Sequence, residues 1–321
     1  MGLGAFVVKR LVGAAAVLVF VSAITFFLVH LAPGNPVVFA LGQRAGQNPQ
    51  LVAQLTHQYG LDQSIFVQYL NYVKDFLHGY LGPSYFDPDP THNVNTILGQ
   101  GLPITLWLGF LATLVALIIG IPLGVLAAVR HNRLLSDNFN MGVMMALYAV
   151  PPLFLIAILR FGVIVFGLSK HAPFIWGSGW GGFTDFHYLL LPVLVYASGI
   201  VGLFARSMRS FMLEVLSQQY IRTAKAKGLA YWRIVFVQAG KNCLVPFASV
   251  FGPTVAFLVV GAFVVETVFG IPGIAQQTVS STINNDYNVT LATTILLAIV
   301  VVIVNALTDL FYAVVDPRVR L

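Results

Sequence analysis

Long uninterrupted runs of apolar residues are the feature that most constrains what this chain can fold into. Six such runs cover residues 11–31, 103–129, 141–168, 189–204, 247–265 and 291–315. A helix of about 20 residues crosses the hydrocarbon core of a bilayer, where the backbone must satisfy its own hydrogen bonds. Hydrophobic residues make up 58% of the 321 and charged residues only 9%, a composition that excludes soluble fold classes. The sequence therefore predicts an all-α, polytopic membrane protein with six transmembrane helices in contact with lipid.

The first run could be taken for a cleaved secretion signal, because Lys9 and Arg10 come directly before it. The apolar part of a signal is roughly 7–15 residues long and ends at a small-x-small cleavage site. This run is longer and no such site follows it, so we expect it to be retained.

Basic residues outside the runs are unevenly divided, and cytoplasmic loops are the ones enriched in Lys and Arg. With the N-terminus inside, only Arg44, Lys74 and Lys170 fall in outer loops. The cytoplasmic ones are then Lys9, Arg10, Arg130, Arg133, Arg206, Arg209, Arg222, Lys225, Lys227, Arg233, Lys241, Arg318 and Arg320. This bias predicts that both termini are cytoplasmic. It also accounts for the net charge of +6 without a nucleic-acid partner.

The first outer segment is long and patterned enough to form structure of its own. Asn48 followed by Pro49 is typical of a helix N-terminus. One helical face is then formed by Phe66, Tyr69, Leu70, Val73, Phe76 and Leu77. We predict two short amphipathic helices around Gly60 that fold over the outer mouth, or alternatively rest on lipid headgroups. The chain thus divides into three parts, residues 1–31, 32–101 and 102–321.

The residues that could carry catalysis or bind a metal are not spaced for either. The seven histidines show no HExxH or other close ligand spacing, and none pairs with Cys243. Gly177, Gly179 and Gly182 formally match GxGxxG. That motif binds a dinucleotide only within a βαβ unit, which cannot form between two membrane spans. GxxxxGK[ST] does not occur, so we expect no catalytic residue, metal or cofactor in this chain.

Two features inside the spans indicate helix contacts. Gly120 and Gly124 form a GxxxG pattern, which permits close helix approach. Arg160 lies in the third predicted span and Glu266 at the outer end of the fifth. Charges at such depth are costly and face a protein interior or a watery path. Arg160 therefore contacts an anionic group on a transport path, pairs structurally with Glu266, or snorkels to the interface.

Positive charge is concentrated in the predicted cytoplasmic loop at residues 206–241. Its apolar helical face is formed by Leu213, Leu216, Tyr220 and Ala224. The basic side chains that project elsewhere are Arg222, Lys225 and Lys227. Gly228 stands where a helix commonly ends in a left-handed conformation, and the small Ala224 and Ala226 would let another protein approach closely. The pattern predicts a docking surface, with an ordinary positive-inside loop as the alternative.

At these residues the chain resembles the inner-membrane permease subunits of ATP-driven peptide importers, the B-type subunit of the dipeptide and oligopeptide systems. YIRTAKAKGL at residues 220–229 is similar to that family's coupling-loop signature. The resemblance assigns ATPase coupling to Tyr220, Arg222, Thr223, Ala224, Lys225, Ala226, Lys227 and Gly228. It continues through KRL at 9–11, TFFLVHLAPGNP at 25–36, YGLDQ at 59–63, GYLGPSY at 79–85, GIPLGVLAA at 120–128, LLLPVL at 189–194, ETVFGIPG at 266–273 and NALTDLFYAVVDPRVR at 305–320. Asn35 and Gln238 depart from the family's usual Asp and His, which affects the expected substrate and not the class.

The resemblance implies a type I importer permease fold in a bacterial or archaeal plasma (inner) membrane. It implies a second homologous permease subunit, an extracytoplasmic substrate-binding protein and two ATP-binding-cassette ATPases that hold ATP and Mg. The chain itself is then not an enzyme. Di- or oligopeptides are the expected substrates, and related permeases carry nickel complexes or glutathione. A membrane receptor or assembly scaffold whose loop recruits a partner without transport is the alternative from a different class.

Overall fold

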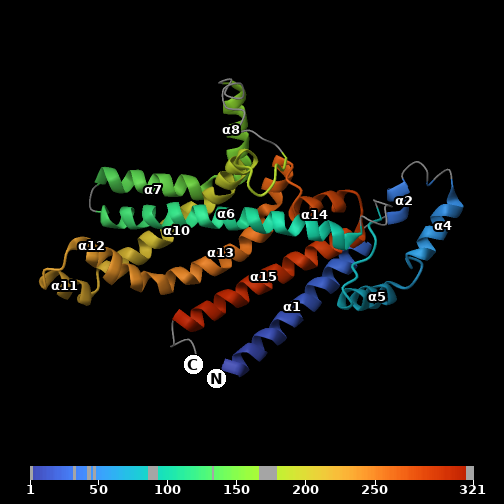
Figure 1. Cartoon of the computed structure of the whole chain (residues 1–321), viewed down its shortest axis with the longest axis horizontal. Helices are drawn as coiled ribbons and strands as arrows, with labels where there is room; N and C mark the ends of the chain where they lie inside the picture. The colour runs from blue at the N-terminus through green and yellow to red at the C-terminus, as the bar shows by residue number, and fades with distance from the viewer. Residues whose placement is uncertain are drawn as a thin grey trace. The chain divides into compact units, whose positions relative to one another are not determined.

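The computed structural model describes residues 3–31, 34–41, 45, 48–85, 93–131, 134–165 and 179–315, and every element in these ranges is a helix (Figure 1). In chain order they are α1 (Leu3–Leu31), α2 (Pro36–Leu41), α4 (Pro49–Gln58), α5 (Ile65–Leu77), α6 (Val94–Val129), α7 (Leu134–Ala149), α8 (Pro152–Val165), α10 (Phe186–Leu216), α11 (Gln219–Ala226), α12 (Tyr231–Arg233), the π-helix η2 (Ile234–Ala239), α13 (Gly240–Phe269), α14 (Ile274–Ile283) and α15 (Tyr287–Val315). The predicted all-α class is confirmed.

Two compact units make up the chain. Unit 1 consists of Leu106–Phe269 and Ile303–Leu321, together with the first two residues. Unit 2 consists of Leu3–Thr105 and Gly270–Val302. The long helices α6 and α15 therefore contribute residues to both units.

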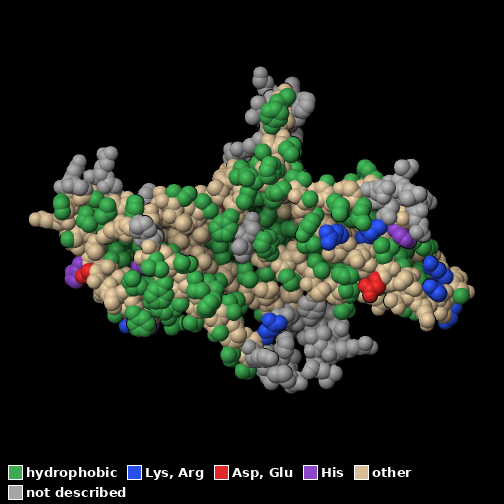
Figure 2. Space-filling model, turned by 180° about the vertical axis from the view of Figure 1, so that it is seen from behind, with side chains coloured by type: hydrophobic (Ala, Val, Ile, Leu, Met, Phe, Trp, Pro, Cys, Tyr) green, Lys and Arg blue, Asp and Glu red, His purple; other side chains and the backbone are tan. Residues whose placement is uncertain are grey.

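Within the described ranges, five helical segments are long and apolar enough to cross a membrane. They are Arg10–Leu31, Val94–Val129, Phe186–Leu216, Tyr231–Phe269 and Tyr287–Thr308, and the bent pair α7 and α8 provides a sixth. Large apolar side chains on these helices are exposed, for example Phe20 at 66% and Phe257 at 72%. Figure 2 shows hydrophobic side chains over much of the described surface. Such a surface is stable against lipid rather than water, which agrees with the prediction of a polytopic membrane protein.

The third predicted span, residues 141–168, differs from a single straight helix. α7 ends at Ala149 and α8 begins at Pro152, and the two helical segments are bent by 100° relative to each other. Pro151 disfavours helical backbone at Val150, and neither of the adjacent prolines has an N–H to donate. Proline is well tolerated at a first helical position, so Pro152 starts a new helix in a new direction.

Close packing in unit 1 depends on glycines of the central helices. A Cβ atom at Gly120 would lie 3.0 Å from Cβ of Phe204, and one at Gly124 would lie 2.8 Å from Cβ of Met208. α6 and α10 thus approach each other with almost no space to spare, as the GxxxG pattern predicts. On another face of α10, a Cβ at Gly202 would lie 2.6 Å from the backbone nitrogen of Tyr148 in α7.

The outer segment of unit 2 forms the two predicted short helices, α4 and α5, on either side of Gly60. The side chain of Asn48 accepts a hydrogen bond from the backbone N–H of Leu51 at 3.2 Å, and Pro49 is the first helical residue. Gly60 has a φ of +66°, a left-handed conformation that reverses the chain between the helices. The predicted helix start and turn are confirmed, whereas the site on which the two helices rest stays a prediction.

α5 packs against α1 within unit 2 through aromatic side chains. The ring centroids of Phe26 and Tyr69 are 5.3 Å apart in an edge-on arrangement. The hydroxyl groups of Tyr69 and Ser22 lie within hydrogen-bonding distance at 3.1 Å. The apolar face differs slightly from the predicted one, because Phe66, Leu70 and Leu77 of that face are exposed.

Candidate functional site

The predicted docking segment forms a short helix of its own, α11, that is fixed to unit 1 along one side. α10 ends at Leu216 and α11 begins at Gln219, with two residues between them. Ile221 is fully buried, and α11 lies against η2, where Ile234 and Val235 are also buried. The expected apolar face through Leu213, Leu216, Tyr220 and Ala224 is wrong at Tyr220, which is 42% exposed; Ile221 and Ala224 form the buried face of α11. Ile221 is the anchor that the sequence reasoning missed.

The end of α11 is closed by a pair of backbone hydrogen bonds across Gly228. The N–H of Gly228 donates to the carbonyl oxygen of Lys225 at 3.0 Å, and the N–H of Leu229 donates to that of Ala224 at 3.3 Å. This is the Schellman arrangement, which needs a left-handed residue after the helix. Gly228 has a φ of +74° and supplies it. The predicted helix end at Gly228 is confirmed.

The two alanines of the segment lie on opposite sides of α11. Ala224 is 7% exposed and is packed within its own chain. Ala226 is exposed. The sequence interpretation gave both alanines the same role of admitting a partner, but in this structure only Ala226 is on the accessible side. The reason is helical geometry, since Ile221 and Ala224 are three residues apart and share the buried face.

Polar contacts connect α11 to the beginning of the long helix α13. The side-chain amide of Asn242 donates to the hydroxyl oxygen of Tyr220 at 3.0 Å and to the carbonyl oxygen of Gln238 at 2.7 Å. Gln238 belongs to the π-helix η2, a form often found at functional positions. Asn242 at the beginning of α13 thus bonds to both α11 and η2. Thr223 contributes only a local hydrogen bond, from its hydroxyl to the carbonyl oxygen of Gln219 at 3.3 Å.

The exposed side of this region combines basic and aromatic groups. Arg222, Lys225 and Lys227 are all exposed, and Figure 2 shows Lys and Arg side chains gathered at the end of unit 1 formed by α11 and α12. Tyr231 and Trp232 on α12 are 53% and 63% exposed. Tyr, Trp and Arg are the residue types that most often dominate protein–protein binding. The sequence reasoning missed this aromatic pair, although its position just after the helix-ending glycine was a usable signal.

The two candidate charges of unit 1 are Arg160 in α8 and Glu266 in α13. Glu266 is 0% exposed in α13. The hydroxyl of Tyr196 is also buried, and no hydrogen-bond partner for it occurs among the described residues. The side chain of Arg160 lies outside the described residues, so its pairing with Glu266 or contact with a substrate stays a prediction. Among the groups that the structure describes, no set of three or more His, Cys, Asp or Glu side chains is placed to hold a metal ion.

Comparison with known proteins identifies the family. The family of binding-protein-dependent transport system inner membrane components matches residues 120–321, and the N-terminal region of such membrane components matches residues 3–108. The oligopeptide transport system permease protein OppB of Salmonella typhimurium is 36% identical over 315 residues, which cover 98% of this chain and 99% of that protein. The dipeptide transport system permease protein DppB of Bacillus subtilis is 34% identical over 316 residues, covering 98% of each chain.

The chain therefore belongs to the inner membrane components of binding-protein-dependent transport systems. It is a multi-pass permease subunit of the ATP-binding-cassette class in the inner membrane, and such subunits carry no catalytic site. The resemblance inferred from the coupling segment is confirmed over 98% of the chain.

Proposed function

We propose that this chain forms half of the translocation path of an ATP-driven peptide importer and has both termini in the cytoplasm. The observation that carries this proposal is the end-to-end similarity to permeases named for oligopeptide and dipeptide transport. The similarity includes the membrane helices, the outer helices α4 and α5 and the exposed segment from α11 to α12. A receptor or scaffold that only recruits a partner would need the docking segment alone. Similarity over the whole length therefore favours a transport function.

The proposed partners follow from the division of labour within this class. A second homologous permease would complete the path, an extracytoplasmic binding protein would deliver the peptide, and two ATPase subunits would hold ATP and Mg. The exposed cations Arg222, Lys225 and Lys227, with the aromatic residues of α12, make a suitable contact for an ATPase surface. Hydrolysis would take place on the ATPases and not on this chain.

The proposed mechanism uses α11 as a lever. Closure of the ATPase pair would displace α11, and its contacts through Ile221 and Tyr220 would carry that displacement to η2 and α13. The permease pair would then change between outward-open and inward-open states. ATP can drive this change only if the ATPases bind it more tightly in one state than in the other. The bound peptide must also have different affinities for the two states.

Uptake by the complete reconstituted complex tests the proposal. The chain is assembled in vesicles with the proposed second permease, ATPases and binding protein. Labelled dipeptide, tetrapeptide, glutathione and a nickel chelate are then offered with and without ATP. We expect ATP-dependent uptake of at least one of the two peptides. Uptake of only glutathione or the chelate would reassign the substrate, and an intact complex that transports none of them would favour a receptor or scaffold.

A further inference from the structure

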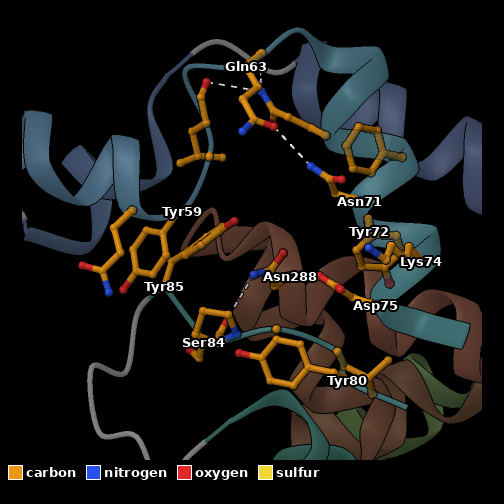
Figure 3. A pocket seen from close by; sticks show the side chains of 18 of the residues that line it. Tyr59, Gln63, Asn71, Tyr72, Lys74, Asp75, Tyr80, Ser84, Tyr85 and Asn288 are labelled. Carbon is orange, nitrogen blue, oxygen red and sulfur yellow. Dashed lines mark hydrogen bonds between the residues drawn. The ribbon is translucent and has the colours of Figure 1, made fainter. Parts of the chain in front are cut away.

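A polar cavity of about 810 Å³ lies within unit 2, beside the turn between α4 and α5. Figure 3 shows that its walls come from this turn, from α5, from residues 80–85 and from the beginning of α15. None of the sequence motifs predicts a cavity here, because its walls come from distant parts of the chain. Asn288, for example, donates a hydrogen bond to Pro83, which lies 205 residues earlier in the sequence.

Tyrosine rings form a large part of the cavity wall. Tyr59, Tyr72, Tyr80 and Tyr85 all line it. The ring centroids of Tyr59 and Tyr85 are 4.9 Å apart. Burial and the nearby carboxylate of Asp286 raise the pKa of both phenols above the ordinary value, so both rings stay neutral. The faces of neutral tyrosine rings attract cations.

The charged side chains on the wall of this cavity are Asp75 and Lys74. Asp75 points from α5 into it, toward Asn288 (Figure 3). Asp286 is buried behind the wall, where its carboxylate accepts a hydrogen bond from the hydroxyl of Ser84. Lys74 also lines the cavity, as do His30 and His57, and His57 contacts the carboxylate of Asp62 at 2.8 Å. Asp75 is therefore the carboxylate that a ligand in the cavity can contact directly.

Amide side chains beside Asp75 supply acceptors for a polar ligand. The amide nitrogen of Asn71 donates to the side-chain oxygen of Gln63 at 3.2 Å. This contact leaves the amide oxygen of Asn71, one turn of α5 before Asp75, to accept from a ligand N–H. The amide nitrogen of Asn288 donates to the carbonyl oxygen of Pro83 at 3.0 Å, which holds the side chain that faces Asp75 in place.

We propose that this cavity binds the free N-terminal ammonium group of a short peptide, with Asp75 as its counter-ion and the tyrosine rings around it. The inference rests on the proposed function, since it takes a peptide as the ligand that the protein transports. A carboxylate, neutral aromatic faces and amide oxygens are the groups that recognise an ammonium ion followed by a peptide backbone. Peptides whose amino end is blocked would be bound less well.

The test compares two probes on the full chain, paired with its homologous permease in lipid nanodiscs without the binding protein. Equilibrium binding is measured for trialanine and for N-acetyl-trialanine. We expect trialanine to bind about five- to tenfold more tightly, the effect of one charge-assisted contact in a partly hydrated site. Asp75→Asn, which keeps the shape of the side chain, should abolish this preference.

Two further variants separate the proposed contact from a general effect on the outer segment. Asp62→Asn removes an acid from the same segment that pairs with His57 and does not line the cavity, so the preference for trialanine should remain. Lys74→Gln removes the opposing charge, so trialanine should bind more tightly than to the parent. This gain cannot result from misfolding. Melting temperatures of all three variants serve as the check on folding.

Equal affinity of the parent for the two probes would overturn the inference, as would equal effects of Asp75→Asn and Asp62→Asn. Binding of trialanine only when the binding protein is added would also overturn it, because the permease pair would then hold no ammonium site of its own. These results are distinct from failure of the proposed function. Peptide uptake by a complex that shows no ammonium preference would refute only the inference, and trialanine binding without any peptide uptake would refute only the function.

Discussion

At the scale of single residues, Gly228 determines how α11 ends and how Leu229 continues toward α12. Its φ of +74° is a conformation that side chains with a branched Cβ rarely adopt. A Cβ atom at this position would have nothing within 4 Å, so the cost of a substitution lies in the backbone and not in a clash. The exposed residues of α11 and α12 keep their relative orientation only while this turn persists.

We predict that Gly228→Val leaves membrane insertion intact and weakens coupling to the ATPases. The strained backbone costs about 1 kcal/mol or more, which favours other conformations of the turn. ATPase co-purification, substrate-stimulated ATP hydrolysis and peptide uptake are measured on the same reconstituted complex. We expect a loss of co-purification, or hydrolysis that no longer accompanies uptake.

Gly79→Val is the matched control for this prediction. Gly79 has a φ of +79° and likewise has nothing within 4 Å of an added Cβ, but it lies after α5 in unit 2. It should carry a similar backbone cost and leave ATPase co-purification at the parent level. Equal co-purification of the Gly228→Val variant and the parent would show that this turn is not part of the transmission element.

At the scale of helices, unit 1 depends on the close approach of α6 to α10. A Cβ atom added at Gly124 would meet the backbone of α10 as well as the Cβ of Met208. Backbone atoms cannot move aside by a rotamer change, so the two helices would have to separate. In lipid, such packing is a main source of helix association, because hydrocarbon tails are as apolar as the side chains.

We predict that Gly124→Ala destabilises the protein by about 1–3 kcal/mol, the usual range for overpacking. Gly109→Ala on the same helix is the control, because nothing lies within 4 Å of an added Cβ there. That variant should be neutral or slightly more stable, as alanine is a better helix former than glycine. Thermal unfolding of the purified proteins in one detergent compares them. Equal melting temperatures for the two variants would contradict the packing argument.

At the scale of the whole molecule, the orientation in the membrane decides whether α11 can meet an ATPase. The excess of Lys and Arg in alternate loops predicts that the segment from α11 to α12 is cytoplasmic and that α4 and α5 are outside. The single cysteine of the chain, Cys243, is fully buried. It therefore provides an unreactive background for labelling.

We predict opposite labelling of two single substitutions by a membrane-impermeant maleimide applied to sealed spheroplasts. Gln54→Cys on α4 and Lys227→Cys after α11 both replace exposed residues. The first should react at once and the second only after the membrane is permeabilised. The parent controls for Cys243. Labelling of position 227 in sealed spheroplasts would reverse the proposed topology and remove α11 from the reach of cytoplasmic ATPases.

Short sequence patterns were sufficient to predict the membrane helices and two helix ends, because these features depend on residues close together in the chain. The length of each apolar run predicted a membrane helix, because backbone N–H and C=O groups inside a bilayer can form hydrogen bonds only with one another. Asn48 with Pro49, and Gly228 after a short helix, marked ends that depend on only a few neighbouring residues. The GxxxG pattern also indicated a helix contact correctly, but it did not identify α10 as the partner.

Tertiary structure alone decided which face of each helix is available for contact. By sequence alone, Ala224 and Ala226 are equally suitable as contact residues. The packing of α11 on η2 buries Ala224 and leaves Ala226 exposed. The 100° bend at Pro151 and Pro152 interrupts an apolar run that by hydropathy alone reads as one span. The cavity beside Asp75 was beyond sequence reasoning because Asn288 reaches its wall only through the folded chain. Hydropathy and capping act over a few residues, whereas burial and cavities arise from contacts between segments far apart along the chain.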